Sequence, residues 1–187
     1  RLGLGLIIAS ALVTIAVAFC GPSSVTLKLG ERINFLPPWY LPVKWLPLGE
    51  WVAVPALWTG IALGALGLLI CWRAVNLGWR PSNRRLFLTG SVLSIATSLV
   101  PPLTSADVLM YAAYGRIQVL GLNPYDITPA EIFRQEFDPL LIVTERPWQD
   151  TPSVYGPLAS ASQWLAAYLG GGNMHNTVFW LQMFALL

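Results

Sequence analysis

Long stretches without a charged side chain constrain the fold of this chain more than any other feature. A helix that crosses a bilayer needs about 20 apolar residues. Uncharged runs of that kind occupy residues 2–21, 51–72 and 86–100, the last ending where Pro101 and Pro102 would break a helix. Only 11% of the 187 residues are charged, against roughly 25% in soluble proteins. The sequence therefore predicts an all-α, polytopic integral membrane protein.

The C-terminal stretch carries no charge after Asp150, but it is interrupted by a run of glycines at 170–172. Glycine runs are loop signals, so this stretch reads as two helices, over 152–169 and 177–187. Thirteen residues from Pro157 are short for a span, so the first helix either begins near Pro152 or does not fully cross. Both chain ends look cut, and we expect residues 1–187 to be a single membrane domain belonging to a longer polypeptide.

Positive charges indicate how the spans are oriented. Four arginines and no acid lie between the second and third spans, at positions 73, 80, 84 and 85. Loops rich in Arg and Lys stay on the cytoplasmic side. The segment 21–50, rich in Trp and Pro, should then lie along the outer interface, and 101–156 should form a second, longer outer loop. The predicted location is the plasma membrane, with this loop extracytoplasmic.

The outer loop also gathers most of the acids. Seven of the nine Asp and Glu residues lie in it or at its border: Asp107, Asp126, Glu131, Glu136, Asp138, Glu145 and Asp150. Loops of about 50 residues are uncommon in compact proteins and are usually functional. We therefore expect the chemistry of this protein to occur outside the cell. The net charge of +2 is too small to indicate a nucleic-acid partner.

A helix is predicted to start just after Pro101-Pro102, with Ser105 as its N-cap. At about 100° per residue, one stripe of it is polar, and carries Asp107, Tyr111, Tyr114 and Gln118. The opposite side is apolar, so we predict an amphipathic helix lying at the membrane surface. An acid in the first turn also stabilises the helix dipole, and spacing alone leaves that interpretation open beside a catalytic one. Phenols that can hydrogen-bond a polar substrate favour catalysis.

Two turn-rich segments follow in the same loop. GLNPYDITP places Asn123 and Tyr125 between turn dipeptides, and WQDTPSVYGPL places Asp150 and Tyr155 directly before a helix that Pro157 should open. These residues, with Tyr111, Tyr114 and Arg116, are the candidates for substrate binding.

Cations and metals give weaker signals. Arg116, Arg134 and Arg146 could each pair with a loop acid or bind a phosphate bidentately, and the sequence does not select one. His175 has no companion His or Cys, so no metal ligand is assigned. A divalent cation on the loop acids is an alternative that no acidic motif spacing supports. Cys20 and Cys71 are expected at opposite membrane faces, unpaired.

The segments SADVLMYAAYGR, GLNPY and WQDTPSVYGPL resemble the polyprenol-phosphate-mannose-dependent α-(1→6)-mannosyltransferases of actinobacteria. These are multi-spanning enzymes of the glycosyltransferase-C superfamily, which elongate lipomannan. The resemblance covers about 50 residues of the outer loop. Many relatives place this loop after the first span, whereas here two further spans precede it.

The resemblance implies that Asp107, at the head of the first large outer loop, is the general base. It implies a polyprenyl-phosphate-mannose donor, a lipid-anchored mannan acceptor on the outer face, and inversion by single displacement, with no cofactor. A sugar hydroxyl is a poor nucleophile and needs a positioned base, which agrees with that role.

Two other classes of function stay open from the residues alone. A transporter or flippase of a lipid-linked sugar would carry charged residues inside its spans, and the predicted spans have none. A non-catalytic membrane subunit, whose outer loop binds a partner, is the second alternative.

Overall fold

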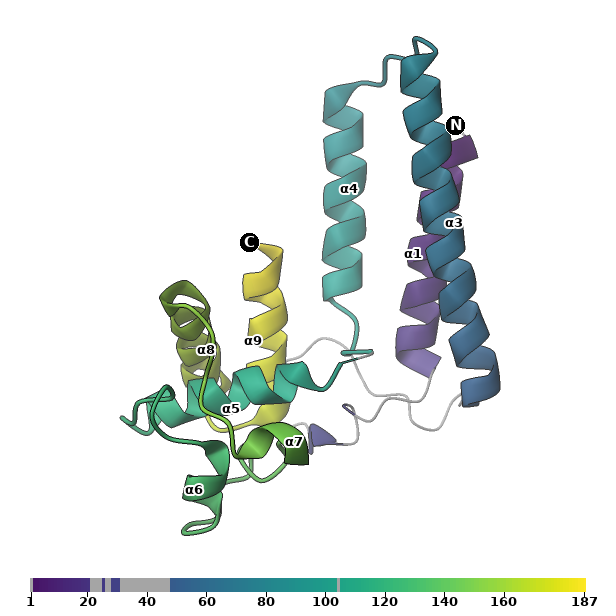
Figure 1. The fold of residues 1–187 in the computed structure, drawn as a ribbon. Helices are drawn as coiled ribbons and strands as arrows, with labels where there is room; N and C mark the ends of the chain where they lie inside the picture. Colours follow the sequence, from purple (N-terminus) through teal and green to yellow (C-terminus); the bar gives the residue numbers. More distant parts are fainter. Residues whose placement is uncertain (1, 21–24, 26–27, 31–47, 104) are drawn as a thin grey trace. The chain divides into compact units, whose positions relative to one another are not determined.

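The computed structural model describes residues 2–20, 25, 28–30, 48–103 and 105–187 (Figure 1). Arg1 and most of the predicted interface segment 21–50 lie outside these described residues. Every regular element within the described ranges is helical, which confirms the all-α class. The chain packs as two compact units, one formed by Arg1–Pro22 with Leu41–Leu103 and the other by Ser23–Tyr40 with Thr104–Leu187.

The described residues of the first unit form three helices, which run alongside one another in Figure 1. They are α1 (Leu2–Cys20), α3 (Glu50–Asn76) and α4 (Asn83–Ser98). Helix α1 packs mainly against α3, in antiparallel orientation, and more lightly against α4. All three match helices that the uncharged runs predict, although α4 begins three residues before its predicted apolar run and includes two arginines.

Small residues allow α1 and α3 to approach closely. A Cβ atom on Gly67 of α3 would lie 2.7 Å from the Gly3 carbonyl oxygen of α1, and one on Gly64 would lie 2.9 Å from Ser10 Oγ. Glycines at an interface let two helix backbones come together, and this is the usual way that helices pair in lipid. The close contact between α1 and α3 therefore depends on glycine at these positions, because glycine has no side chain to keep the backbones apart.

Two helices of the described residues, α1 and α3, are long and apolar enough to cross a membrane. Most large apolar side chains of α3 are exposed, among them Trp58 and Leu68, and α1 exposes Leu2, Ile8 and Leu12. Helix α4 has 16 residues, or about 24 Å of helix, against about 30 Å for a hydrocarbon core. The crossing of the third predicted span stays a prediction.

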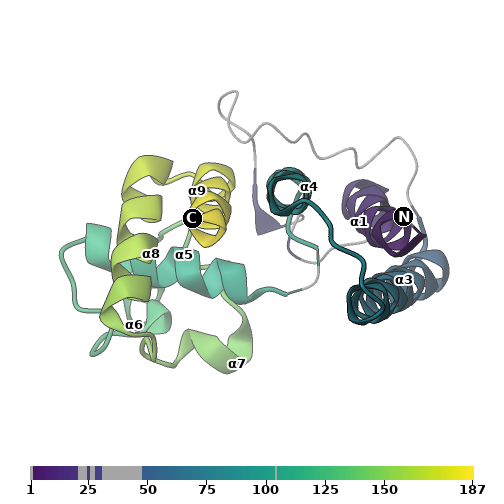
Figure 2. The ribbon, with the colours of Figure 1, turned by 90° about the horizontal axis from the view of Figure 1, so that it is seen from above.

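The second unit is built around α5 (Asp107–Val119), which runs across both α8 (Pro157–Gly170) and α9 (Met174–Leu186) in Figures 1 and 2. Two short helices, α6 (Pro129–Phe133) and α7 (Arg146–Gln149), lie in the connection between α5 and α8. Thr128 and Glu131 form a complete capping box on α6, each side chain accepting a backbone N–H of the other residue.

The structure corrects the prediction of an amphipathic surface helix in one respect. Seven of the 13 residues of α5 are buried, among them Tyr114 of the stripe predicted to be polar and Ala112 of the opposite side. The cause is close packing on α8: a Cβ atom on Gly115 would overlap the Gln163 backbone carbonyl. Helix α5 is thus the centre of its unit, and its one exposed residue is Asp107.

The C-terminal helices follow the predicted pattern with shifted boundaries. Helix α8 begins at Pro157, the residue predicted to open it. The alternative start near 152 is wrong, because residues 151–156 are held in a non-helical segment described below. The glycine loop ends α8, with Gly171 and Gly172 at φ values of 59° and 78°, a backbone conformation that suits glycine. Helix α9 starts at Met174, where the Asn173 side chain accepts the Asn176 N–H.

Candidate functional site

Three motif segments, distant in the sequence, meet in the second unit. The connecting piece is 151–156, which precedes α8. The Tyr114 hydroxyl of α5 donates to the Thr151 carbonyl at 3.0 Å. The Ser153 N–H donates to the Pro124 carbonyl at 2.7 Å, and the Tyr125 hydroxyl donates to the Tyr155 carbonyl at 2.8 Å. Hydrogen bonds to its backbone therefore fix this segment to both α5 and the 122–127 turn.

Tyr155 is brought against the exposed end of α5 by these bonds. Its ring meets that of Tyr111 edge to face, with centroids 5.1 Å apart, and lies 6.1 Å from that of Tyr114. Edge-to-face contacts at such distances are favourable. Tyr111, Tyr114 and Tyr155 form a cluster of three phenols, called the tyrosine cluster below.

Asp107 opens α5 next to the tyrosine cluster and is exposed. The predicted cap is shifted by one residue: Ala106 is the N-cap, and Ser105 Oγ instead accepts the Asp107 N–H at 3.2 Å. This bond fixes the backbone of Asp107 and leaves its carboxylate at the surface. An exposed carboxylate on a fixed backbone is suited to accepting a proton from a bound hydroxyl.

Two phenols of the cluster, those of Tyr114 and Tyr155, have a raised pKa and stay protonated at physiological pH. Burial raises the pKa of Tyr155 to about 12, and a hydrogen bond with Tyr111 and the nearby charge of Asp107 act in the same direction. Burial also raises the pKa of Tyr114. A neutral phenol donates a hydrogen bond but does not act as a base. The arrangement thus places one carboxylate beside groups that can only donate or accept hydrogen bonds.

Tyr114 and Arg116, both predicted to bind substrate, are engaged inside the protein. Tyr114 is buried, and its hydroxyl is bonded to backbone carbonyls. The Arg116 Nε donates to Asp138 Oδ2 at 2.8 Å, and Asp138 also accepts the N–H groups of Leu140 and Leu141. Nine residues of helix separate Arg116 from Asp107, which places them on opposite sides of α5.

Asn123 and Asp150, also predicted to bind substrate, have partners within the protein too. Asn123 closes a turn: its Oδ1 accepts the Tyr125 N–H at 3.1 Å, and its amide donates to Asp126. Asp150 forms an ion pair with Arg134 at 2.8 Å, in which both side chains are more than half exposed. The structure therefore brings Asp107, Tyr111 and Tyr155 together, with Tyr114 and Tyr125 as their supports.

Ser160 is a residue of this site that the sequence argument missed. It is buried in the first turn of α8, where its hydroxyl lies 2.6 Å from the Tyr125 hydroxyl and its carbonyl accepts from Gln118 of α5. The only signal was a small polar residue in an otherwise apolar helix, which is too common to select. Its importance comes from contacts that are 35 and 42 residues distant in the sequence.

No metal ligand set is found within the described ranges: they hold no group of three or more His, Cys, Asp or Glu placed to bind an ion. His175 is buried, and its Nε2 lies 2.7 Å from the Gly30 carbonyl oxygen. Cys20 and Cys71 are free and half-buried, both in the first unit.

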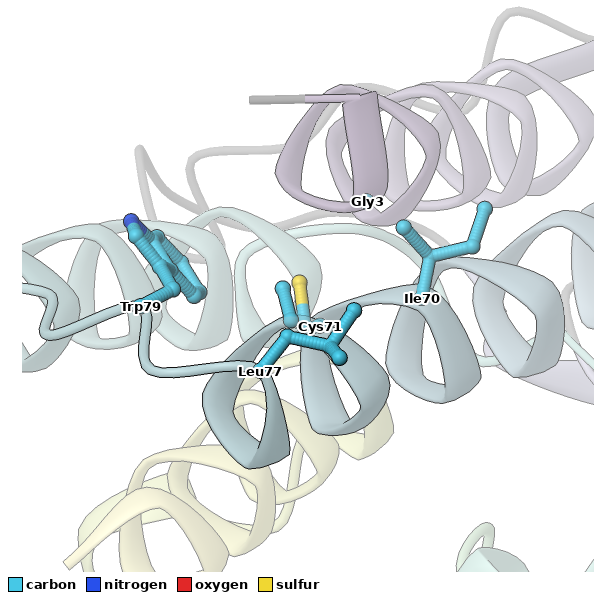
Figure 3. Close-up of a pocket in the computed structure, with 6 residues that line it drawn as sticks. Gly3, Ile70, Cys71, Leu77 and Trp79 are labelled. Atoms are coloured by element: carbon cyan, nitrogen blue, oxygen red, sulfur yellow. The ribbon is translucent and has the colours of Figure 1, made fainter.

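Each unit also has a pocket of its own. The one in the first unit, of about 320 Å³, lies at the end of α3 and is lined by apolar and small residues: Gly3, Ile70, Cys71, Ala74, Leu77 and Trp79 (Figure 3). Its lining side chains include no carboxylate, histidine or lysine. The one in the second unit, of about 450 Å³, lies between the 122–127 turn and α6, and Glu131, Gln135 and Glu136 line it together with three apolar side chains.

Comparisons with known proteins agree with the three motifs. A family model described as the alpha-(1->6)-mannopyranosyltransferase N-terminal domain matches residues 4–187. A protein of Mycolicibacterium smegmatis, named as a probable alpha-(1->6)-mannopyranosyltransferase, is 35% identical over 100 residues. That match covers 54% of this chain but 18% of the relative, so the chain aligns with only a small part of that protein. No solved structure matches the chain.

Proposed function

This chain belongs to the alpha-(1->6)-mannopyranosyltransferase family, whose N-terminal domain it matches, and we propose that it supplies the catalytic base of a mannosyltransferase. The donor would be a polyprenyl-phosphate-mannose and the acceptor a membrane-anchored mannan at the outer face of the plasma membrane. The observation that carries this proposal is the exposed Asp107 carboxylate, fixed at the head of α5 beside the tyrosine cluster.

The proposed reaction is a single displacement at the anomeric carbon. Asp107 takes the proton of the acceptor hydroxyl, and the hydroxyl oxygen forms a bond to C1 of mannose. The bond between C1 and the phosphate oxygen breaks, and polyprenyl phosphate leaves with the electron pair. Attack from the opposite side converts a β-linked donor into an α-linked product. A positioned base typically accelerates such a step by about 10²–10⁴-fold.

The leaving phosphate needs cationic or hydrogen-bonding stabilisation. The ion pairs of Arg116 and Arg134 bear on which arginine of the loop would bind this phosphate. Arg116 is committed to the buried Asp138, so its removal would leave an unpaired internal charge. Arg134 shares an exposed pair with Asp150, and Arg146 is exposed at the start of α7. We propose these two, in place of Arg116, as the phosphate-binding candidates of this chain.

The membrane arrangement is part of the same proposal. Helices α1 and α3 are apolar over lengths that can cross a bilayer, and the arginine-rich connection between α3 and α4 favours a cytoplasmic position for it. The second unit would then lie at the outer face, where a lipid-linked donor presents its sugar. Membrane lipids would cover the exposed apolar surfaces of α1 and α3.

The test is transfer of radiolabelled mannose from the polyprenyl-phosphate donor by the full-length protein in membranes. We expect Asp107→Asn to lower turnover at least 100-fold at unchanged protein level, because the amide cannot accept the proton. Glu136→Gln is the matched control, since it removes an exposed acid of the same loop that lies outside the proposed base position. Near-normal turnover by Asp107→Asn would exclude Asp107 as the base. Translocation of the donor without transfer would favour a flippase.

A further inference from the structure

The Tyr125 hydroxyl already has two partners inside the protein, although the sequence placed it among the substrate-binding groups. It donates to the Tyr155 carbonyl at 2.8 Å and lies 2.6 Å from Ser160 Oγ. A phenol hydroxyl has one proton to donate. Since that proton goes to Tyr155, the Ser160 hydroxyl is the donor of the second bond, and the two hydroxyls form a relay ending on the Tyr155 backbone.

This relay is anchored on elements that are hydrogen-bonded to α5 and to the 122–127 turn. Ser160 is 5% exposed, and its carbonyl accepts from Gln118 Nε2 at 3.1 Å. The Pro124 carbonyl, next to Tyr125, accepts the Ser153 N–H at 2.7 Å. The backbone at 153 and 155 is thus attached to the 122–127 turn at two points, one on each side of Val154. These two hydrogen bonds, one before and one after Val154, fix both the position and the orientation of the backbone at Tyr155.

The fixed residue is the one whose ring packs on Tyr111, one helical turn from Asp107, and whose hydroxyl is influenced by the Asp107 charge. Tyr155 contacts Tyr111 and Tyr114 through its ring, while its carbonyl is the acceptor of Tyr125. Loss of the Tyr125 hydroxyl would leave the Tyr155 carbonyl without this donor and free the ring to move away. A shift of about 1 Å at a reacting group can lower a rate about 100-fold.

We propose that Tyr125 is a positioning residue: through its hydroxyl bonds to Tyr155 and Ser160, it places Tyr155 beside Asp107 and makes no contact with substrate. This inference rests on the proposed function, because it assigns Tyr125 a role in the same reaction. It also gives the GLNPY motif a purpose that its turn geometry alone does not explain, namely to clamp the segment that precedes α8.

The activity test is a double-mutant cycle in the full-length protein, with turnover and donor KM measured separately. We expect Tyr125→Phe to lower kcat about 10-fold with donor KM unchanged. Because Tyr125 acts through Tyr155, Tyr125→Phe added to Tyr155→Ala should cause no further loss. If the two losses multiply, or if donor KM rises with kcat unchanged, Tyr125 binds substrate directly and the proposal is overturned.

Two matched controls separate positioning from general destabilisation. Ser160→Ala should reproduce part of the kcat loss, whereas Ser162→Ala should not, because the Ser162 hydroxyl donates to the Ala159 carbonyl within its own helix turn. Tyr168→Phe, at an exposed ring stacked on Trp164, should also leave kcat unchanged. Equal losses in Ser160→Ala and Ser162→Ala would contradict the relay.

A measurement independent of activity keeps the two proposals distinguishable. Hydrogen–deuterium exchange of 151–156 should become at least 10-fold faster in Tyr125→Phe, with exchange in α1 and α3 unchanged. If the wild-type protein transfers no mannose, the proposed function fails. Hydrogen–deuterium exchange alone then tests whether Tyr125 holds the 151–156 segment in place. If transfer occurs but exchange at 151–156 is the same in both proteins, the positioning role fails while the proposed function stands.

Discussion

Both units contain close helix contacts at glycines, such as Gly67 in the first and Gly115 in the second, but they differ in the polar bonds that add to these contacts. In the first, α1 and α3 approach because Gly3, Gly64 and Gly67 lack side chains. In the second, α5, α8 and the intervening loop are joined by polar side chains bonded to distant backbone groups. The first arrangement leaves no room for a Cβ atom at Gly3 or Gly67. The second depends on individual hydroxyl and carboxylate groups, and it is the unit in which the candidate site lies.

The largest loss of stability that would test this difference between the units is expected on substitution of Asp138. Its carboxylate, 8% exposed, pairs with Arg116 and accepts two backbone N–H groups. We expect Asp138→Ala to lower the free energy of unfolding by about 3–5 kcal/mol, because Arg116 is left as an unpaired, partly buried charge. Thermal unfolding in detergent measures this.

Asp150→Ala is the control for Asp138, since its ion pair with Arg134 is largely exposed and pairs of that kind contribute about 0–1 kcal/mol. A loss at Asp138 no larger than at Asp150 would contradict the importance given to the internal polar network.

The next largest effect concerns the glycine interface of the first unit. Gly67→Ala would place a Cβ atom 2.7 Å from the Gly3 backbone carbonyl, and overpacking of this kind costs about 1–3 kcal/mol. Gly90→Ala in α4 is the matched control, because no atom lies within 4 Å of its added Cβ. There we expect a gain of up to about 1 kcal/mol from helix propensity. Equal effects at the two glycines would show that α1 and α3 do not pack as described.

The stability of the second unit should depend on alkaline pH through Tyr155, whereas that of α1 in the first unit should not. The folded-state pKa of Tyr155 is about 12, above the ordinary value of 10.0. Its contribution to stability is therefore complete below pH 10 and is lost as the pH rises from 10 to 12. Tyr155→Phe should reduce the fall in melting temperature over that range, while helix α1, which has no ionisable tyrosine, should melt independently of this change. An unchanged alkaline profile in the variant would exclude Tyr155 as its source.

The smallest effect is expected at the cap of α6. Hydrogen bonds from Thr128 hold the pKa of Glu131 below its ordinary value of 4.5. The cap therefore stabilises α6 above pH 4.5 and is lost as the pH falls below it. Glu131→Gln should abolish this dependence, as measured by hydrogen exchange in 129–134, and leave exchange in α8 unchanged. Persistence of the acid-induced exchange in the variant would assign it to another group.

Those features of the fold that depend on local patterns could be predicted from the sequence. Uncharged length predicts α1 and α3, and the glycine run predicts the turn between α8 and α9. Helical spacing also brings Asp107 and Tyr111 to one open end of α5. Each of these features depends on residues within a few turns of one another, where periodicity and turn propensity act.

Partners that come from distant segments could not be predicted. The stripe of α5 correctly groups Tyr114 with Asp107, but spacing does not show that α8 and the 151–156 segment cover Tyr114. Nor does it show that Arg116 meets Asp138, since any of seven loop acids could be its partner. The roles of Tyr125 and Ser160 depend on one contact between residues 35 positions apart. A single sequence contains no pattern that selects such a pair.

The antiparallel pairing of α1 and α3 gives the chain two native topology reporters. Cys71 lies against Gly3 at the start of α1, and Cys20 ends the same helix. The two thiols are therefore separated along the helix axis by roughly 25 Å, close to the thickness of a hydrocarbon core. In a variant of the full-length protein whose cysteines outside residues 1–187 are replaced, a membrane-impermeant maleimide applied to intact cells and then to opened vesicles should label Cys20 and Cys71 in turn. The order of labelling would reveal the orientation of the hairpin without any engineered tag.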